Sequence, residues 1–215
     1  MPRLSEVGRD DIHPQGERIY NLLFGDRDPV AEPGTQTGSP GNWWTVYALS
    51  PGTFDDAAST FGYYQSKERV LDPKLRELGQ MRAGWACSSQ FVFSQHCKAA
   101  RDYGVTEDQI EAIPSWQVAD CYSPLERAVL AYTDALAYDH GRVADPVFEV
   151  LKEHLSEAAI VELTYIVGVY IMHAITTRAL RLEFDDVDER VVEVARPDGS
   201  LGGLGVLPGE RRPRG

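Results

Sequence analysis

Apolar residues recur at helical spacing through most of this chain. After Asp72, for example, Leu75, Leu78 and Met81 fall on one side of a helix. One short stretch, Arg190–Ala195, alternates apolar and polar residues instead, and it predicts either a strand or an extended arm. Because no other segment shows sustained alternation together with hairpin turns, the pattern predicts an all-α protein.

Residues that cap helices mark the starts of the predicted segments. Thr106 and Ser123 each stand three residues before a glutamine or a glutamate, which is the spacing of a capping box. Ser156 precedes the longest apolar segment, and Gly25 and Gly104 follow the ends of two others. The expected helices are 13–24, 53–67, one that starts at 73 and runs past 81, 89–104, 106–114, 123–138, 145–155 and 157–182.

The helical segments concentrate in the middle of the chain, which predicts a single-domain helical bundle with extended arms at both ends. Residues 1–52 hold one short amphipathic helix and a loop rich in glycine, proline and threonine. Residues 53–182 form the predicted bundle. Residues 183–215 end in proline, glycine and arginine with few apolar anchors, so this C-terminal arm is expected to be partly flexible or to lie on a neighbouring subunit.

The chain of 215 residues carries a formal charge of −12, which argues against binding to nucleic acid or to an anionic membrane. Its longest apolar run, Tyr165–Ala174, is too short to span a bilayer, and no signal peptide is visible at the N-terminus. Three cysteines are too few for a disulfide framework. These features predict a reduced, cytoplasmic protein. The five histidines are widely scattered, so no metal site is expected.

An acid and a base, Glu77 and His96, stand on two consecutive predicted helices. Ser89 and Val92 precede His96 on the same helix face. Glu77 could hydrogen-bond one ring nitrogen of His96 and fix its tautomer, or it could simply pair with a neighbouring arginine such as Arg76. An imidazole held in this way suits proton transfer at a carbon next to a carbonyl group. The Ser89 hydroxyl is the expected donor to an oxyanion, although Ser89 could equally be the helix N-cap.

Two stretches of the sequence resemble the carboxymuconolactone decarboxylase and alkylhydroperoxidase-D-like superfamily. The first runs from Leu75 through Glu77 and His96 to Ile113, and the second is Leu163–Ala174. Together the resemblance covers roughly residues 73–182. It implies a helical bundle of the alkylhydroperoxidase-D-like type that assembles as a homo-oligomer, a trimer or a hexamer. An apolar closing helix, hydrophobic around most of its girth, fits burial between subunits.

The chain departs from both branches of this family at the same place. The redox branch has cysteines twelve and fifteen residues after the glutamate and a histidine nineteen residues after it. Counted from Glu77, these positions hold Ser89, Val92 and His96. The decarboxylase branch often has an acid at the position of Val92 and a tryptophan at that of Phe93. The acid and the histidine are therefore kept, while both redox sulfurs are replaced.

The resemblance and the acid–base pair together predict a cofactor-independent lyase or isomerase. It would act by histidine-mediated proton transfer on a small cyclic oxo-acid or lactone, in aromatic catabolism or specialised metabolism. The expected catalytic residues are His96, Glu77 and Ser89, and the expected substrate-binding residues are Cys87, Trp85, Val92, Phe93 and His173. Two alternatives stay open: an unconventional thiol-dependent peroxidase that uses Cys87 or Cys97, and a non-catalytic ligand-binding member of the family.

Several candidates also have a simpler structural interpretation. The cysteines could pack as small hydrophobic residues. His173 lies in an apolar helix, where a packed histidine is the commoner case. Trp43, Trp44 and Trp85 could form an aromatic wall for a ring-shaped substrate, or they could pack against the helix bundle.

Overall fold

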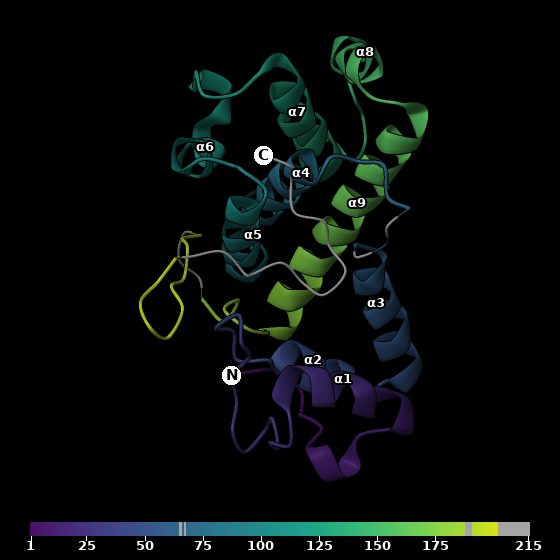
Figure 1. Ribbon diagram of the computed structural model, residues 1–215, viewed down its shortest axis with the longest axis vertical. Helices are drawn as coiled ribbons and strands as arrows, with labels where there is room; N and C mark the ends of the chain where they lie inside the picture. Colours follow the sequence, from purple (N-terminus) through teal and green to yellow (C-terminus); the bar gives the residue numbers. More distant parts are fainter. Residues whose placement is uncertain (65, 67, 188–190, 202–215) are drawn as a thin grey trace.

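The computed structural model describes residues 1–64, 66, 68–187 and 191–201, which are helical or irregular and contain no strand. The helices are α1 (Pro14–Phe24), α2 (Asn42–Tyr47), α3 (Pro51–Tyr64), α4 (Pro73–Ala86), α5 (Gln90–Asp102), α6 (Glu107–Ala112), α7 (Pro124–Tyr138), α8 (Asp145–His154) and α9 (Glu157–Leu180), with 3₁₀ helices at Arg9–Asp11 and Ile113–Val118. Figure 1 shows their arrangement. The predicted all-α class is confirmed.

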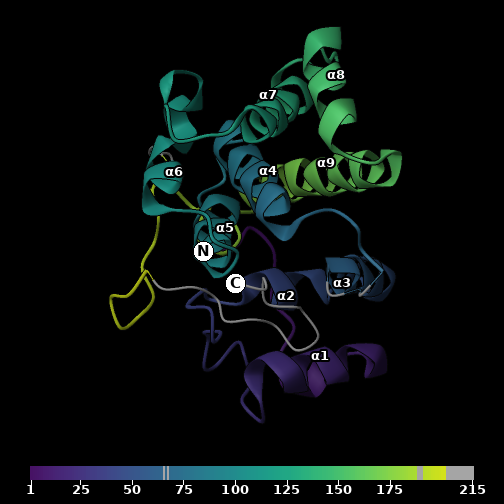
Figure 2. The same ribbon diagram turned by 45° about the horizontal axis from the view of Figure 1, so that its top comes forward.

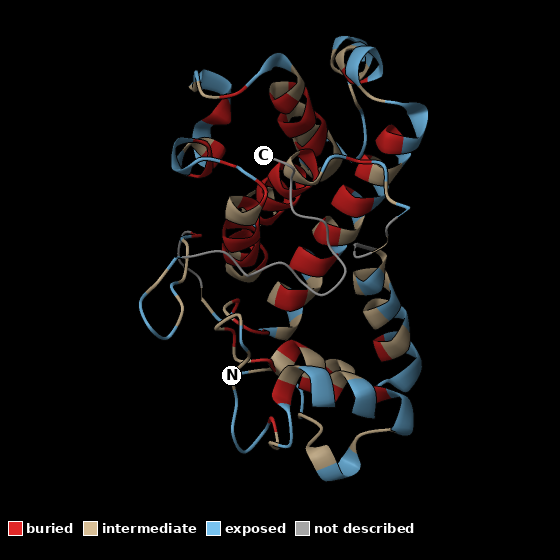
Figure 3. Cartoon of the chain, viewed as in Figure 1, coloured by how far each residue is buried: buried red, intermediate tan, exposed pale blue. Residues whose placement is uncertain are grey.

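Helix α4 lies at the centre of the bundle. It begins at Pro73, because the Asp72 carboxylate caps two N–H groups of its first turn and proline fits the first helical position. Helices α5, α7 and α9 pack around it, and Figure 3 shows α4 buried along most of its length. The packing against α5 needs a glycine, since a Cβ atom on Gly84 would lie 2.5 Å from the backbone N of Phe93.

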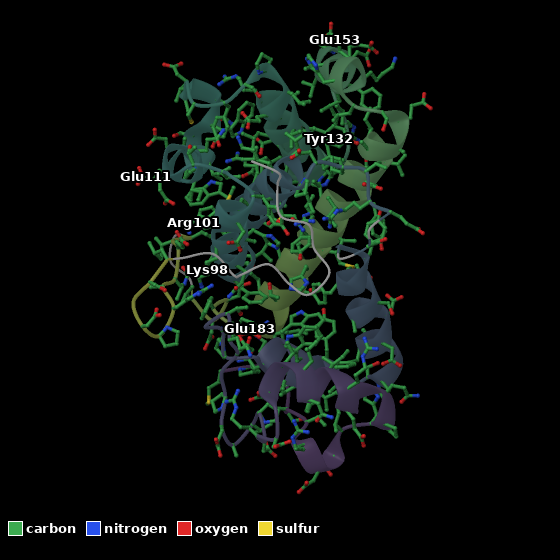
Figure 4. The ribbon with its side chains drawn as sticks, in the orientation of Figure 1. Lys98, Arg101, Glu111, Tyr132, Glu153 and Glu183 are labelled. Carbon is green, nitrogen blue, oxygen red and sulfur yellow. The ribbon has the colours of Figure 1, made fainter. Side chains whose placement is uncertain are left out.

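Helices α1, α2 and α3 lie together at one end of the molecule (Figures 1 and 2). The sequence pattern does not predict α2, because it has only six residues and no side chain caps it locally. Its cap comes from a distant part of the chain. The Glu183 carboxylate, which follows α9, accepts the N–H groups of Gly41 and Trp43 at 2.9 and 2.8 Å. Figure 4 labels Glu183 at this junction.

The C-terminal arm lies along α5. The N–H of Val194 donates to the Ser94 hydroxyl at 2.9 Å, and Arg101, labelled in Figure 4, forms two hydrogen bonds with the Glu193 carboxylate. Residues 191–195 form an extended arm and no strand, which decides between the two alternatives for this stretch; residue 190 lies outside the described part of the chain. The C-terminal arm was also expected to be partly flexible, and residues 202–215, to which that prediction applies, lie outside the described part of the chain.

Helix α9, capped by Ser156, is the longest helix. By length and composition it could cross a membrane, as the core helix of a soluble protein also could. One side packs against α4, α5, α7 and α8. The opposite side leaves four large apolar side chains exposed: Val161, Tyr165, Met172 and Ile175. The division of the chain at residues 52 and 182 stays a prediction.

Candidate functional site

Glu77 and His96 meet at the interface of α4 and α5. The two helices are joined by a tight turn at 87–89, so they run antiparallel and bring residues far apart in sequence to one level. The His96 Nδ1 atom lies 2.7 Å from Oε2 of Glu77. Only 2% of Glu77 and 9% of His96 are exposed, so this hydrogen bond is protected from water.

Arg76 holds the other oxygen of the same carboxylate. Its Nε and Nη2 atoms donate to Oε1 of Glu77 at 2.9 and 2.6 Å, and its guanidinium lies 5.0 Å from the centre of the Tyr103 ring. Burial raises the pKa of Glu77, but the positive charges of Arg76 and His96 and their hydrogen bonds outweigh this effect, so the pKa is lowered. Glu77 is therefore an anion that accepts hydrogen bonds from two partners.

The ionised carboxylate fixes the tautomer of His96. Because Glu77 can only accept, the proton of the neutral ring stays on Nδ1 and the lone pair is on Nε2. Nε2 makes no hydrogen bond within the described part of the chain, and it is not fully buried. This nitrogen is thus the atom that can take a proton from a substrate, while Glu77 stabilises the resulting imidazolium.

A cluster of aromatic rings begins beside His96, at Tyr170 of α9. The Tyr170 ring stands edge-on to the imidazole, with 4.4 Å between ring centres. One turn further along α9, the His173 ring lies nearly parallel to Tyr170 at 5.7 Å and to Trp43 at 5.3 Å. The Phe91 ring lies at 5.9 Å from His173. On this side the pair therefore adjoins a cluster of mostly apolar rings.

His173, unlike His96, has no carboxylate beside its ring among the described residues. Burial, with a smaller contribution from the charge of His96, lowers the pKa of His173 to about 3. Its ring makes no hydrogen bond among the described residues. His173 is therefore a neutral ring at physiological pH, and it stacks on the tryptophan that α2 supplies.

Ser89 and Val92 lie at the beginning of α5. The Ser89 hydroxyl donates to Asp185 at 2.6 Å and accepts the N–H of Val92 at 3.1 Å, which confirms its interpretation as the N-cap. Seven helical residues, about 10 Å along the axis, separate Ser89 from His96. The structure therefore does not bring the Ser89 hydroxyl to the acid–base pair. Val92 is buried against Gly84 of α4.

The other predicted binding residues lie at the far end of α4. Trp85 and Phe93 pack edge to face at 5.6 Å. Cys87 is the C-cap of α4, ten residues or about 15 Å along the axis from Glu77. Burial raises the pKa of the Cys87 thiol, and it raises that of the fully buried Cys97 thiol further. Neither environment favours a thiolate.

Sequence reasoning did not assign Tyr170 to the site, and it did not foresee that Trp43 would reach it through His173. A helical signal existed for Tyr170, because it stands three residues before His173 on the same side of α9. Arg76 was foreseen as a possible partner of Glu77, and the structure shows both partners at once. No group of three or more metal-binding side chains occurs in the described ranges.

Comparison with known proteins places these features in a family. Residues 53–135 match the model of the carboxymuconolactone decarboxylase family. An uncharacterised protein of Bacillus subtilis (strain 168), YdfG, is 29% identical over 104 residues, which are 48% of this chain and 71% of that protein.

Two solved structures have a similar fold. One is ATU0492 from Agrobacterium tumefaciens, a protein of unknown function for which a role as the antioxidant defence protein AhpD has been suggested; its TM-score is 0.58 at 26% identity, over 69% of this chain and 97% of that one. The other is a single-site variant of the debrominase Bmp8 in complex with 2,3,4-tribromopyrrole, with a TM-score of 0.67 at 17% identity, over 86% of this chain and 95% of that one. Over residues 53–135 the chain is therefore similar to the carboxymuconolactone decarboxylase family, and its fold is like that of the alkylhydroperoxidase-D-like proteins, with Ser89 and Val92 at the two positions where the redox branch has cysteines.

Proposed function

We propose that the protein is a cofactor-independent lyase or isomerase that moves a proton on a small cyclic oxo-acid or lactone. The observation that carries this proposal is the His96 ring, whose Nδ1 is held by an ionised Glu77 while Nε2 is open. A positioned base of this kind contributes about 10²–10⁴ to a rate. The remaining acceleration must come from orientation of the substrate and stabilisation of charge on its oxygen.

The proton balance of the proposed reaction is simple. In an isomerisation, Nε2 of His96 takes a proton from a carbon next to a carbonyl group and the electron pair moves to the carbonyl oxygen. The proton on Nε2 exchanges with solvent, and His96 returns a proton to the same carbon or to another one as the carbonyl group forms again. In a decarboxylation, His96 first takes up a proton from solvent at Nε2. The bond to the carboxylate carbon then breaks, carbon dioxide leaves, its bonding electron pair forms an enolate, and the enolate carbon takes the proton from Nε2. Glu77 keeps its charge throughout and offsets the positive charge of the imidazolium.

The environment of the cysteines supports a reaction that needs no thiol. Cys97 is fully buried, and burial raises the pKa of both Cys97 and Cys87, so neither is activated as a nucleophile. Val92, which stands where the redox branch has its second cysteine, can neither donate a proton nor form a disulfide. A thiol peroxidase would need a nucleophile that this arrangement does not supply.

The aromatic cluster near His96 supports a ring-shaped substrate. Tyr170, His173 and Phe91 offer ring faces and edges, and aromatic groups bind planar molecules through such contacts. The debrominase with the similar fold binds 2,3,4-tribromopyrrole, which is also a small planar ring. A five- or six-membered ring with a carbonyl group is the substrate class that fits this reasoning.

Deuterium exchange tests the proposal without knowledge of the natural substrate. Cyclic oxo-acids and lactones, beginning with carboxymuconolactone, are incubated with the protein in D₂O and followed by NMR. We expect deuterium at the carbon next to the carbonyl, and a loss of about 10²–10⁴ in this rate in His96→Gln. An exchange rate that is the same in both proteins, or no exchange with any member of the panel, would refute the proposal and favour a binding role.

We also propose that the protein is a homo-oligomer, a trimer or a hexamer, that buries the exposed side of α9. Val161, Tyr165, Gly168, Met172 and Ile175 follow one another at intervals of four and three residues, the spacing of a helix seam that packs on another helix. Light scattering should return a multiple of the 23.9 kDa chain mass, and Ile175→Glu should reduce it. A wild-type protein of the single-chain mass would contradict this.

A further inference from the structure

Two buried glutamines near the acid–base pair have unused hydrogen-bonding capacity. Gln80 of α4 is 1% exposed and its Oε1 has no donor, and Gln95 of α5 is 8% exposed and its Nε2 has no acceptor. Among the described residues neither amide makes any hydrogen bond. A buried amide without partners destabilises a fold, and such groups are uncommon in proteins.

The register of α4 and α5 sets Gln80 at the level of His96. Glu77 contacts His96, and Gly84 packs against Phe93. Residues 77–84 of α4 therefore lie opposite the part of α5 that contains Phe93 and His96. Gln80 stands one turn after Glu77, in the middle of this stretch.

The direction of Gln80 follows from the residues around it on the helix. Glu77 and Gly84 point to α5, whereas a Cβ on Gly79 would meet Val167 of α9 at 2.9 Å. Successive residues turn by roughly 100°, which places Gln80 between these two directions. Its side chain therefore extends toward the junction of α4, α5 and α9, where His96 meets Tyr170.

Proton transfer next to a carbonyl group needs a hydrogen-bond donor at that junction. Negative charge develops on the substrate oxygen when the proton leaves carbon, and a donor in a dry site stabilises it strongly. Ser89 cannot fill this role, because its hydroxyl is bound to Asp185. A glutamine amide can present an N–H group toward a ligand by rotating about its last bond.

We propose that Gln80 donates a hydrogen bond to the substrate oxygen on which negative charge develops, and so acts as a catalytic residue beside His96. This rests on the proposed function and narrows its substrate class to rings whose oxygen becomes an enolate or a phenolate-like anion. The amide stays unpaired in the free protein because the substrate supplies its partner.

A binding experiment tests the role of Gln80 apart from turnover. The probe is 4-nitrophenolate, a planar ring with an anionic oxygen, titrated by calorimetry at a pH at which its hydroxyl is ionised. Gln80→Met keeps the length of the side chain and removes the donor. Gln90→Met is the matched control, because Gln90 lies at the start of α5 and its Oε1 accepts the N–H of Val192 in the C-terminal arm.

We expect Gln80→Met to weaken 4-nitrophenolate binding by about 10- to 100-fold, the effect of one hydrogen bond to a charged group, and Gln90→Met to leave it unchanged. The thermal midpoint of Gln80→Met should be equal to or above that of the wild type, since an unpaired buried amide is removed. Equal affinity in wild type and Gln80→Met, or no binding by the wild type at millimolar probe, overturns the inference.

The same experiment separates this inference from the proposed function. If the probe binds in a way that depends on Gln80 but no cyclic oxo-acid exchanges deuterium, the oxyanion-binding role of Gln80 is supported and the proposed reaction is refuted. Exchange that depends on His96 but is unaffected in Gln80→Met would support the reaction and refute the role of Gln80.

Discussion

Replacing Glu77 with glutamine should strongly destabilise the protein, because both neighbours of this carboxylate are donors. Arg76 donates to Oε1 and His96 donates to Oε2, and the side chains of Arg76 and Glu77 are each 3% exposed. An amide of the same shape keeps one acceptor and turns an NH₂ group toward the other donor. Either the guanidinium or the imidazole is then left without a partner in a buried position.

The magnitude follows from the burial of the charge that remains. Breaking a buried ion pair by removing one partner costs about 3–5 kcal/mol, because the other charge stays uncompensated. In a protein of 150–250 residues, 1 kcal/mol corresponds to about 2–4 °C in the unfolding temperature. We therefore expect Glu77→Gln to lower this temperature by between about 6 and 20 °C at pH 7.

The pH dependence gives this prediction a second test. The pKa of Glu77 is lowered in the folded protein, so its contribution to stability is present above the ordinary carboxyl pKa of 4.5 and is lost as the pH falls through the folded value. The difference between wild type and Glu77→Gln should therefore shrink below pH 4.5. Thermal and urea unfolding followed by circular dichroism, at pH 7 and at acid pH, measure this difference.

A matched substitution controls for the change from glutamate to glutamine. Glu107 also accepts two hydrogen bonds from one arginine, Arg101, but its side chain is 62% exposed. Water screens that pair, so Glu107→Gln should change the free energy of unfolding by about 1 kcal/mol or less. If Glu77→Gln were no more destabilising than Glu107→Gln, the Arg76–Glu77–His96 arrangement would not exist in solution as described.

Three further outcomes are expected. Gly84→Ala should destabilise the protein by about 1–3 kcal/mol in urea unfolding, because its Cβ would meet the backbone of Phe93, whereas Gly62→Ala in α3, with open space around it, should stabilise it by about 0.5–1 kcal/mol. Burial raises the pKa of Glu183 to about 7, so its contribution to stability is present below pH 4.5 and is lost as the pH rises through about 7. The free energy of unfolding should fall by about 3 kcal/mol over this range. In Glu183→Gln this fall should be absent, which thermal unfolding at a series of pH values measures. Alkylation of the thiols with iodoacetamide should leave the deuterium exchange rate unchanged, and inactivation by the reagent would revive a thiol mechanism.

The sequence could predict the central pair because local rules determine its geometry. Capping by Asp72 and Ser89 defines where α4 and α5 begin, and the short turn between them makes the helices antiparallel. Glu77 lies nine residues before the end of α4, and His96 lies six residues after the start of α5, so their levels differ by about one helical turn, which a glutamate side chain can span. Helix geometry and two caps were therefore enough to propose the contact as one of two alternatives, beside a pairing of Glu77 with an arginine, and the family spacing favoured a site role for His96.

The surroundings of the pair could not be predicted in this way, because they come from contacts between distant parts of the chain. Trp43 packs on His173, and the helix that carries Trp43 is capped by Glu183 from beyond α9. The sequence of residues 42–47 alone cannot indicate a capping residue that lies about 140 residues away. The role of Ser89 also depends on a residue far away in the sequence. Its hydroxyl was expected to donate a hydrogen bond to a substrate, but it donates to Asp185 instead.

The two histidines beside Tyr170 show how the same side chain acquires different properties within one site. His96 has an ionised carboxylate at 2.7 Å, so a proton added at Nε2 creates an imidazolium with a counterion already in place. His173 has aromatic rings around it and no such partner in the described chain, and burial keeps it neutral with a pKa of about 3. His173 is therefore not an acceptor for a proton near neutral pH, whereas His96 has the carboxylate of Glu77 beside its ring. Val92 stands on the same helix face, where the redox branch has its second cysteine, so no thiol at that position competes with His96 for the proton in the proposed reaction.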